Sequence, residues 1–246
     1  MKTVLKFCAS LVLVTALAGC AATSTVKNAA DYFKEGEDAY SSRNYDEAIA
    51  MWKKVKESYF SPELTTQAEL KIADAQYQSG SYIEAAASYE EFRKLHPTHE
   101  KAPYALFRQG MCQYHQITGV DTDQTPIRNT VLILKSFISI YPDSEYAKEA
   151  REKLDEAVAM QLKYEIYVGR FYLKNEKYQA AIKRLEGALT TFSASPHNDE
   201  TLLYLGEAYL LSGDKAKGKE IFNRLSTEYP ASPFLKDASS FMEKNY

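Results

Sequence analysis

The sequence predicts an all-α solenoid made of about five pairs of antiparallel helices, and three observations predict it. Small residues recur 37 positions apart, first at 36, 73 and 110 and again at 169 and 206. A proline closes each unit, and no segment rich in β-branched residues alternates between turn signals as a strand would. A fixed period of this length is typical of helical-repeat architectures.

The period also predicts how the two helices of a unit pack. Antiparallel helices approach closely only where side chains are small, and a bulky residue one turn later fills the remaining gap. The small residues of the first helices are Gly36, Ala73, Gly110, Gly169 and Gly206. Twelve positions later follow Ala48, Ala85, Ala181 and Gly218, and four further on Trp52, Tyr89, Leu185 and Phe222. This pattern predicts a superhelical solenoid of the tetratricopeptide-repeat (TPR) type.

Prolines mark the boundaries, because proline forbids helix continuation. They are Pro62, Pro97, Pro142, Pro196 and Pro230. We expect three N-terminal repeats in residues 29–142. A long connecting helix, repeats four and five and a C-terminal helix are expected in residues 143–246.

Two segments depart from the regular spacing. In the third unit the small second-helix position falls at Thr130, eight residues late, which predicts an inserted loop at about 118–126. Ser144 to Asn175 contains no proline and one glycine, with apolar residues at helical spacing. It is expected to form one helix of roughly 45 Å at ~1.5 Å per residue.

The N-terminus predicts export and a lipid anchor. Lys2 and Lys6 precede an apolar run that is too short to span a bilayer, which needs about 20 residues. The run ends in Leu17-Ala18-Gly19-Cys20, which resembles the lipobox of bacterial lipoproteins. Residues 1–19 are therefore expected to be a signal peptide, and 20–28 the lipidated cysteine and a polar tether. The alternative is an ordinary secretory peptide with a chance cysteine.

Charge and cysteine content narrow the class further. Without Lys2 and Lys6, 28 basic face 33 acidic side chains, a balance that predicts no nucleic-acid binding. With Cys8 removed and Cys20 acylated, only Cys112 remains, so no disulfide is available. No cofactor is expected beyond the covalent diacylglycerol and N-acyl chain on Cys20, and the lipid is the predicted contact with the membrane.

The sequence predicts neither a catalytic nor a metal site. Candidate metal ligands are sparse and lack the spacing of a zinc site: His96, His99, Cys112 and His115. Asp121 and Asp123 begin an alternation that could suggest a calcium loop, but no bidentate glutamate follows, which favours a solvated loop. No phosphate-binding loop or nucleophile elbow occurs, so the protein is not expected to be an enzyme.

A stripe of large apolar residues follows the first helices of repeats one to three. In this repeat class the first helices line the concave side, so the stripe could form a groove for an apolar, aromatic-bearing peptide. Packing in the repeat core is the alternative. The candidate client-binding residues are Phe33, Tyr40, Leu70, Tyr77, Tyr104, Phe107, Met111 and Tyr114.

Signal peptide, lipobox and five repeats together resemble the BamD family of lipoproteins, which act in β-barrel assembly in the outer membrane. The supporting stretches are Pro97-Thr98-His99, Gly119-Val120-Asp121, residues 141–146, Lys163-Tyr164-Glu165 and Arg184-Leu185-Glu186-Gly187. In lipoproteins of this kind, Ala21 after the cysteine favours sorting to the outer membrane.

The resemblance implies a scaffold on the periplasmic face of the outer membrane. Its C-terminal repeats would bind the periplasmic domains of the barrel-forming partner BamA, through Arg184 and Glu186, and its N-terminal repeats would receive unfolded outer-membrane proteins. Accessory lipoproteins of the same complex are further expected partners. On the residues alone, Arg184 lies beside the inward stripe of its helix and can reach outward, or it can pair with Glu186 or a neighbouring repeat.

Two rival classes remain at this point. One is another TPR lipoprotein of the envelope, associated with pili, the cell wall or the Tol-Pal system. The other is a periplasmic enzyme accessory, which would need a titratable cluster that the sequence lacks.

Overall fold

The computed structural model describes residues 27–58 and 61–245, which form eleven helices and no strand. Cys20, its signal peptide and most of the predicted tether lie outside the described residues. The helices are α2 (Ala29–Ser41), α3 (Tyr45–Glu57), α4 (Pro62–Gln78), α5 (Tyr82–Leu95), α6 (Ala102–His115), α7 (Thr125–Ile140), α8 (Ala147–Lys174), α9 (Tyr178–Thr191), α10 (Asn198–Leu211), α11 (Lys215–Glu228) and α12 (Leu235–Asn245). The predicted all-α class is confirmed.

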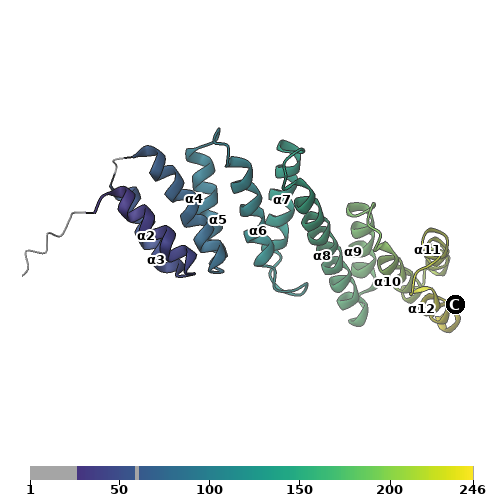
Figure 1. Ribbon diagram of the computed structural model, residues 1–246. Coiled ribbons are helices and arrows are strands. Elements are labelled where there is room, and N and C mark those ends of the chain that lie inside the picture. Colours follow the sequence, from purple (N-terminus) through teal and green to yellow (C-terminus); the bar gives the residue numbers. More distant parts are fainter. Residues whose placement is uncertain (1–26, 59–60, 246) are drawn as a thin grey trace, which may run out of the picture.

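Successive helices pack in antiparallel pairs and stack into an elongated solenoid that runs from α2 to α12 (Figure 1). Most contacts join neighbours in sequence, as expected where each repeat is stabilised by the repeats beside it. The core is accordingly a chain of clusters along the axis, each shared by adjacent helices.

The 37-residue period sets the closest helix contacts. The small residue of each first helix lies under the bulky residue of the second, so a Cβ added to Gly169 would come within 2.6 Å of Leu185 and one added to Gly206 within 2.5 Å of Phe222. Gly36 lies in the same way under Trp52. The TPR architecture predicted from these spacings is therefore confirmed.

The third repeat keeps this geometry despite its longer loop. Gly110 lies against Leu134, one turn after the fully buried Thr130, so the packing position is displaced along the chain without being lost. The loop between α6 and α7 is stabilised by hydrogen bonds from a buried side chain of the loop itself. Gln124, only 8% exposed, donates to the carbonyls of Val120 and Thr122 at 2.8 and 2.9 Å.

The long helix α8 joins the two parts of the solenoid. Its first half packs against α7 through Ala150 and Ala157, and its second half packs against α9 through Leu162 and Ile166. The helix begins at Ala147, three residues later than the sequence suggested, because residues 142–146 form the turn that follows Pro142.

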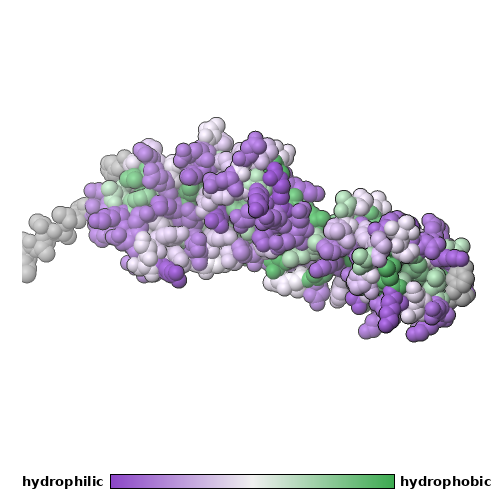
Figure 2. Space-filling model, turned by 45° about the vertical axis from the view of Figure 1, so that its right-hand side comes forward, coloured by the Kyte–Doolittle hydropathy of each residue, from purple (hydrophilic) through white to green (hydrophobic). Residues whose placement is uncertain are grey.

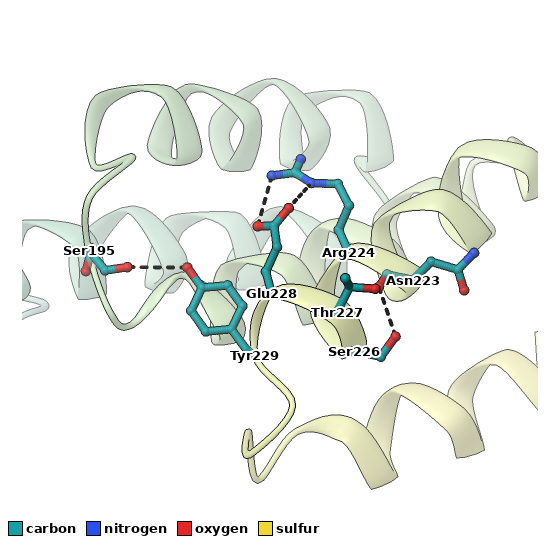
Figure 3. Close-up of polar contacts among 7 residues, drawn as sticks. All are labelled: Ser195, Asn223, Arg224, Ser226, Thr227, Glu228 and Tyr229. Atoms are coloured by element: carbon teal, nitrogen blue, oxygen red, sulfur yellow. Dashed lines mark hydrogen bonds and ion pairs between the residues drawn. The ribbon is translucent and has the colours of Figure 1, made fainter.

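The C-terminal corner is closed by polar contacts (Figure 3). The Tyr229 hydroxyl donates to the carbonyl of Ser195 at 3.4 Å, which ties the end of α11 to the turn before α10. Arg224 pairs with Glu228 one turn along α11. Helix α12 then covers the last core cluster with Leu235, Phe241 and Met242. Across the described residues, no helix is long and apolar enough to cross a membrane.

Candidate functional site

A groove of about 830 Å³ lies between the start of α7, one side of α8 and the outer side of α9. Its aromatic wall is formed by Tyr164 and Tyr172 of α8 and by Phe192. Its charged residues are Arg128, Glu165, Lys183 and Arg184. Gln124, at the end of the long α6–α7 loop, also lines it, so the position of that loop helps to shape this groove.

Arg184 lies in this groove and has a partner inside the protein. Its Nη2 donates to Oε1 of Glu165 on α8 at 2.9 Å, Nε pairs with the other carboxylate oxygen, and the guanidinium lies 5.6 Å from the centre of the Tyr164 ring. Burial raises the pKa of Glu165, and the charge of Arg184 opposes that rise. Of the two alternatives left open by the sequence, the structure shows an internal pair, but with Glu165 of the same repeat and not with Glu186 or a neighbouring repeat.

Glu186 lies away from the groove. It is two residues from Arg184, about 200° around the helix, and its carboxylate accepts a hydrogen bond from the Tyr209 hydroxyl of α10. Burial raises the pKa of Tyr209 to about 12, and the hydrogen bond to Glu186 adds to the rise. The two residues nominated together therefore lie on different sides of α9, and only Arg184 lines the groove.

The groove carries excess positive charge. Arg128 and Lys183 form no ion pair within the described residues, while Glu165 is already paired with Arg184. A second hollow, of about 720 Å³, continues it past Phe192 toward Pro196 and shares Gln161 and Thr191. Asp155 and Glu156 line this second hollow beside Lys135, so the positive charge is confined to the first groove, and it is the first groove that suits an acidic polypeptide segment.

Gly187 lines this groove, and no close packing within the protein requires a glycine at this position. A Cβ added there would meet nothing within 4 Å, unlike the glycines at the helix crossings. A glycine inside a helix costs about 0.5–1 kcal/mol relative to alanine. A residue that weakens α9 and relieves no internal crowding fits a surface that another backbone approaches closely.

The predicted client-binding residues lie along α2, α4 and α6 and are divided among three core clusters. Phe107 and Met111 are only 1% and 3% exposed, so the structure corrects their assignment: both are core residues, inaccessible to a peptide. Six remain partly accessible: Phe33, Tyr40, Leu70, Tyr77, Tyr104 and Tyr114. Tyr40, Tyr77 and Tyr114 occupy the same position in three successive repeats.

Cations from the next first helix cover these rings. Lys71 lies 5.9 Å from the Phe33 ring, Arg108 4.7 Å from the Tyr77 ring, and Lys153 4.8 Å from the Tyr114 ring. Lys71 and Arg108 are one period apart. The predicted groove is thus a cation-covered aromatic surface. The basic groove and its continuation do not include its residues, and a hollow of about 460 Å³ reaches it only at Tyr104.

A buried carboxylate anchors the middle of that surface. Asp74 accepts hydrogen bonds from the hydroxyls of Tyr89 at 2.6 Å and Tyr104 at 2.7 Å, and Arg108 donates to Tyr104 at 3.1 Å. Burial raises the pKa of Asp74, and the two tyrosine hydrogen bonds oppose the rise. Both hydrogen bonds reach the same oxygen, Oδ1, and the nearby charges of Arg108 and Lys71 also oppose the rise.

The histidines have local partners. His96 contacts Glu69 at 2.7 Å, His115 shares a 2.8 Å hydrogen bond with Tyr77, and His99 accepts from the backbone of Lys101. No group of three potential metal ligands occurs in the part of the chain that the structure describes. Burial raises the pKa of the Cys112 thiol to about 12, which disfavours the reactive thiolate.

Sequence reasoning missed two features beside Arg184. Gln124 was counted only as part of the insertion, and Gly187 only as part of a family motif, although a glycine within a helical pattern was a usable signal. It also missed Tyr167 and Phe171 of α8, which are 49% and 56% exposed. Nothing in one sequence tells which aromatics of a long amphipathic helix remain uncovered.

The helix pairs and their 37-residue period define a TPR solenoid. The chain belongs to the YfiO family of outer membrane lipoproteins, whose model matches residues 26–221.

Relatives match over most of their length. The outer membrane protein assembly factor BamD of Caulobacter vibrioides is 29% identical over 213 residues, covering 87% of this chain and 70% of that protein. Its counterpart in Rickettsia prowazekii is 29% identical over 253 residues, covering 100% and 99%. That of Neisseria meningitidis serogroup A is 26% identical over 242 residues, covering 91% of each.

Proposed function

We propose that the protein is a non-enzymatic scaffold subunit of the machinery that assembles β-barrel proteins in the outer membrane. The names of its relatives support this assignment. The main structural support for binding to a partner is the basic groove between α7, α8 and α9. In this proposal an acidic segment of the periplasmic domains of a BamA-like barrel protein occupies that groove.

Three features of the groove favour such a partner. Arg128 and Lys183 supply charge that is not neutralised internally. Arg184 is held in place by Glu165, so its guanidinium is oriented before binding. Gly187 leaves room for a close backbone approach. A partner carboxylate would share the guanidinium with Glu165, and the aromatic wall would exclude water from the contact.

Unfolded outer-membrane proteins are the second proposed ligand. The half-buried tyrosines that recur along α2, α4 and α6 offer rings at a regular spacing, with Lys71 and Arg108 beside them. Such a surface suits weak contacts with many extended segments, because rings and cations accept varied side chains. The lipid on Cys20 would hold the solenoid at the periplasmic face of the outer membrane, where accessory lipoproteins of the complex would join it.

The partner assignment is tested by titrating the lipidated protein, in neutral detergent, with the purified periplasmic domains of the barrel protein from the same organism. Gly187→Ala should weaken binding by ~10-fold through the added methyl group, although it strengthens α9 by about 0.5–1 kcal/mol. Arg184→Leu should weaken binding at least as much, and Arg184→Lys less, because lysine keeps the charge but not the planar fork.

Lys163→Gln is the matched control, since Lys163 is an exposed cation of α8 that does not line the groove. Unchanged affinity for both Gly187→Ala and Arg184→Leu would remove the groove from the interface. Because Gly187→Ala raises helix stability, weaker binding by this variant cannot be attributed to unfolding.

A further inference from the structure

A second groove, of about 450 Å³, lies on the other side of α8, between its last turns and α10. Its principal lining residues are Tyr167, Arg170, Phe171, Lys174, Tyr204 and Glu207. It shares no residue with the basic groove described above. Helix α8 therefore presents two separate surfaces, and a partner on one leaves the other open.

Exposed aromatic side chains distinguish this groove from the rest of the surface. Tyr167 and Phe171 are 49% and 56% exposed and lie one helical turn apart. In the part of the chain that the structure describes, the other large hydrophobics with comparable exposure are aliphatic. Hydrophobic patches interrupt the hydrophilic covering in several places, over the N-terminal part, the middle and the C-terminal part (Figure 2). Neighbouring exposed aromatics with charged residues at the rim are typical of protein interaction sites.

The charges at the rim are not neutralised within the protein. Arg170 lies 4.9 Å from the centre of the Tyr204 ring, but neither it nor Lys174 forms an ion pair among the described residues. Glu207 is the one carboxylate lining the groove, and it has neither a hydrogen bond nor an ion pair there. Burial raises its pKa to about 7, with Asp237 of α12 adding to the rise and Arg170 opposing it. The groove is therefore more positive near neutral pH than a count of its charged residues suggests.

We propose that this groove is a docking site for a second protein, through a segment in which an aromatic side chain lies next to a carboxylate. The aromatic side chain packs between Phe171 and Tyr167, and the carboxylate pairs with Arg170 and Lys174. A basic segment is disfavoured because it would face two cations, and a purely apolar segment would leave both cations unpaired. The site is independent of the partner assigned to the basic groove.

The test uses the lipidated full-length protein in neutral detergent and the peptide Gly-Ser-Asp-Phe-Glu-Phe-Asp-Ser-Gly with blocked termini. Saturation-transfer difference NMR detects weak binding without a dye that could itself enter the groove. We expect saturable binding. Phe171→Ala should weaken it by ~10-fold, the scale of an aromatic anchor, and Arg170→Gln by ~5-fold, the scale of a partly exposed ion pair.

Matched controls separate this site from the other. Leu132→Ala removes an equally exposed side chain, on α7, and should leave peptide binding unchanged. Phe171→Ala should keep the affinity of the parent for the barrel protein's periplasmic domains, and Gly187→Ala the affinity of the parent for the peptide. Each site can thus fail without the other.

Three outcomes would overturn the proposal. Equal binding of the peptide with asparagine and glutamine in place of its acids would mean that the carboxylate is not recognised. Stronger binding of a lysine-substituted peptide would reverse the predicted charge. A dimer in sedimentation analysis that Phe171→Ala dissociates would make a second copy of this chain the occupant.

Discussion

The first helices of the N-terminal and C-terminal repeats share one backbone geometry but differ in the side chains beside the small residue. Two positions before the small residue stand Lys71 and Arg108 in repeats two and three, and Tyr167 and Tyr204 in repeats four and five. One position after it stand Glu37 and Asp74 in repeats one and two, and Arg170 and Glu207 in repeats four and five.

The consequence is visible in the contacts between successive repeats. In the N-terminal half, Lys71 pairs with Glu37 at 2.8 Å, and Arg108 reaches Asp74 through the Tyr104 hydroxyl. At the equivalent C-terminal contact, Arg170 meets the ring of Tyr204, which cannot neutralise it. At these positions the N-terminal repeats therefore engage their charges with each other, whereas Arg170 in the C-terminal half has no ion-pair partner among the described residues.

The largest effect that would break this comparison is expected at Asp74. Asp74→Ala leaves the Tyr89 and Tyr104 hydroxyls without their acceptor in a buried place and leaves Arg108 without its counter-charge. Unsatisfied buried hydrogen-bonding groups cost about 1–3 kcal/mol each, so we expect a loss of about 2–4 kcal/mol in the free energy of unfolding. Urea denaturation followed by circular dichroism measures it. A loss below about 0.5 kcal/mol, the usual range for a surface substitution, would show that the Asp74 hydrogen bonds do not stabilise the N-terminal half.

The equivalent C-terminal residue should respond in the opposite direction. The pKa of Glu207 is raised from 4.5 to about 7 in the folded protein, so its protonation favours the folded state. That stability is fully present below about 4.5 and is lost as pH rises through about 7. At 1.36 kcal/mol per pKa unit, discounted for solvent screening of a partly exposed group, Glu207→Gln should stabilise the protein by about 1–2 kcal/mol at pH 8.

The same substitution should have little effect at pH 4, where the parent side chain is already neutral. Urea denaturation at pH 4, 6 and 8 measures the difference, and Asp237→Asn serves as a control that removes a neighbouring charge. If Glu207→Gln destabilises the protein at pH 8 as Asp74→Ala does, the two halves do not differ in the proposed way.

Much of the fold could be predicted because it depends on spacing. The positions of Gly36, Gly169 and Gly206 fix the helix crossings through side-chain volume alone, and volume is a property of the residue type. The displaced packing position of repeat three was also readable, since Thr130 and Leu134 keep the four-residue step within their helix. Helix starts were less predictable because the turn after Pro142 uses residues that also suit a helix.

The site was less predictable because it depends on what lies between helices. Helical periodicity placed Arg184 at the edge of the inward stripe, yet only the packing of α8 against α9 reveals Glu165 as its partner. The same limit explains Phe107 and Met111, whose spacing matched the accessible tyrosines while their side chains turned into the core. A single sequence does not reveal which aromatic side chains of such a stripe are covered by a neighbouring cation or helix.

The smallest predicted effect concerns what the two halves have in common. The turns within repeats one, two, four and five place the second residue after the first helix at positive φ: Arg43 at 60°, Gly80 at 82°, Glu176 at 59° and Gly213 at 89°. In each turn the next backbone N–H donates to the carbonyl five residues earlier, at 2.9–3.0 Å. The backbone geometry of the turns is thus the same in both halves. Glycine adopts the positive φ without strain in two of them, whereas Arg43 and Glu176 adopt it with a side chain.

Arg43→Gly and Glu176→Gly should therefore each stabilise the protein, and by similar amounts. A left-handed conformation costs a non-glycine residue roughly 1–2 kcal/mol, and the greater freedom of glycine in the unfolded chain offsets part of that, leaving a gain of about 0.5–1 kcal/mol. Gly80→Ala is the matched reverse change and should lose a similar amount. Thermal melts of the three variants measure these shifts. Both side chains are exposed, so loss of packing cannot hide the backbone effect. If only one of the two variants is stabilised, the N-terminal and C-terminal repeats differ in backbone strain as well as in surface chemistry. If both are stabilised equally, the two halves differ only in the side chains around each small residue.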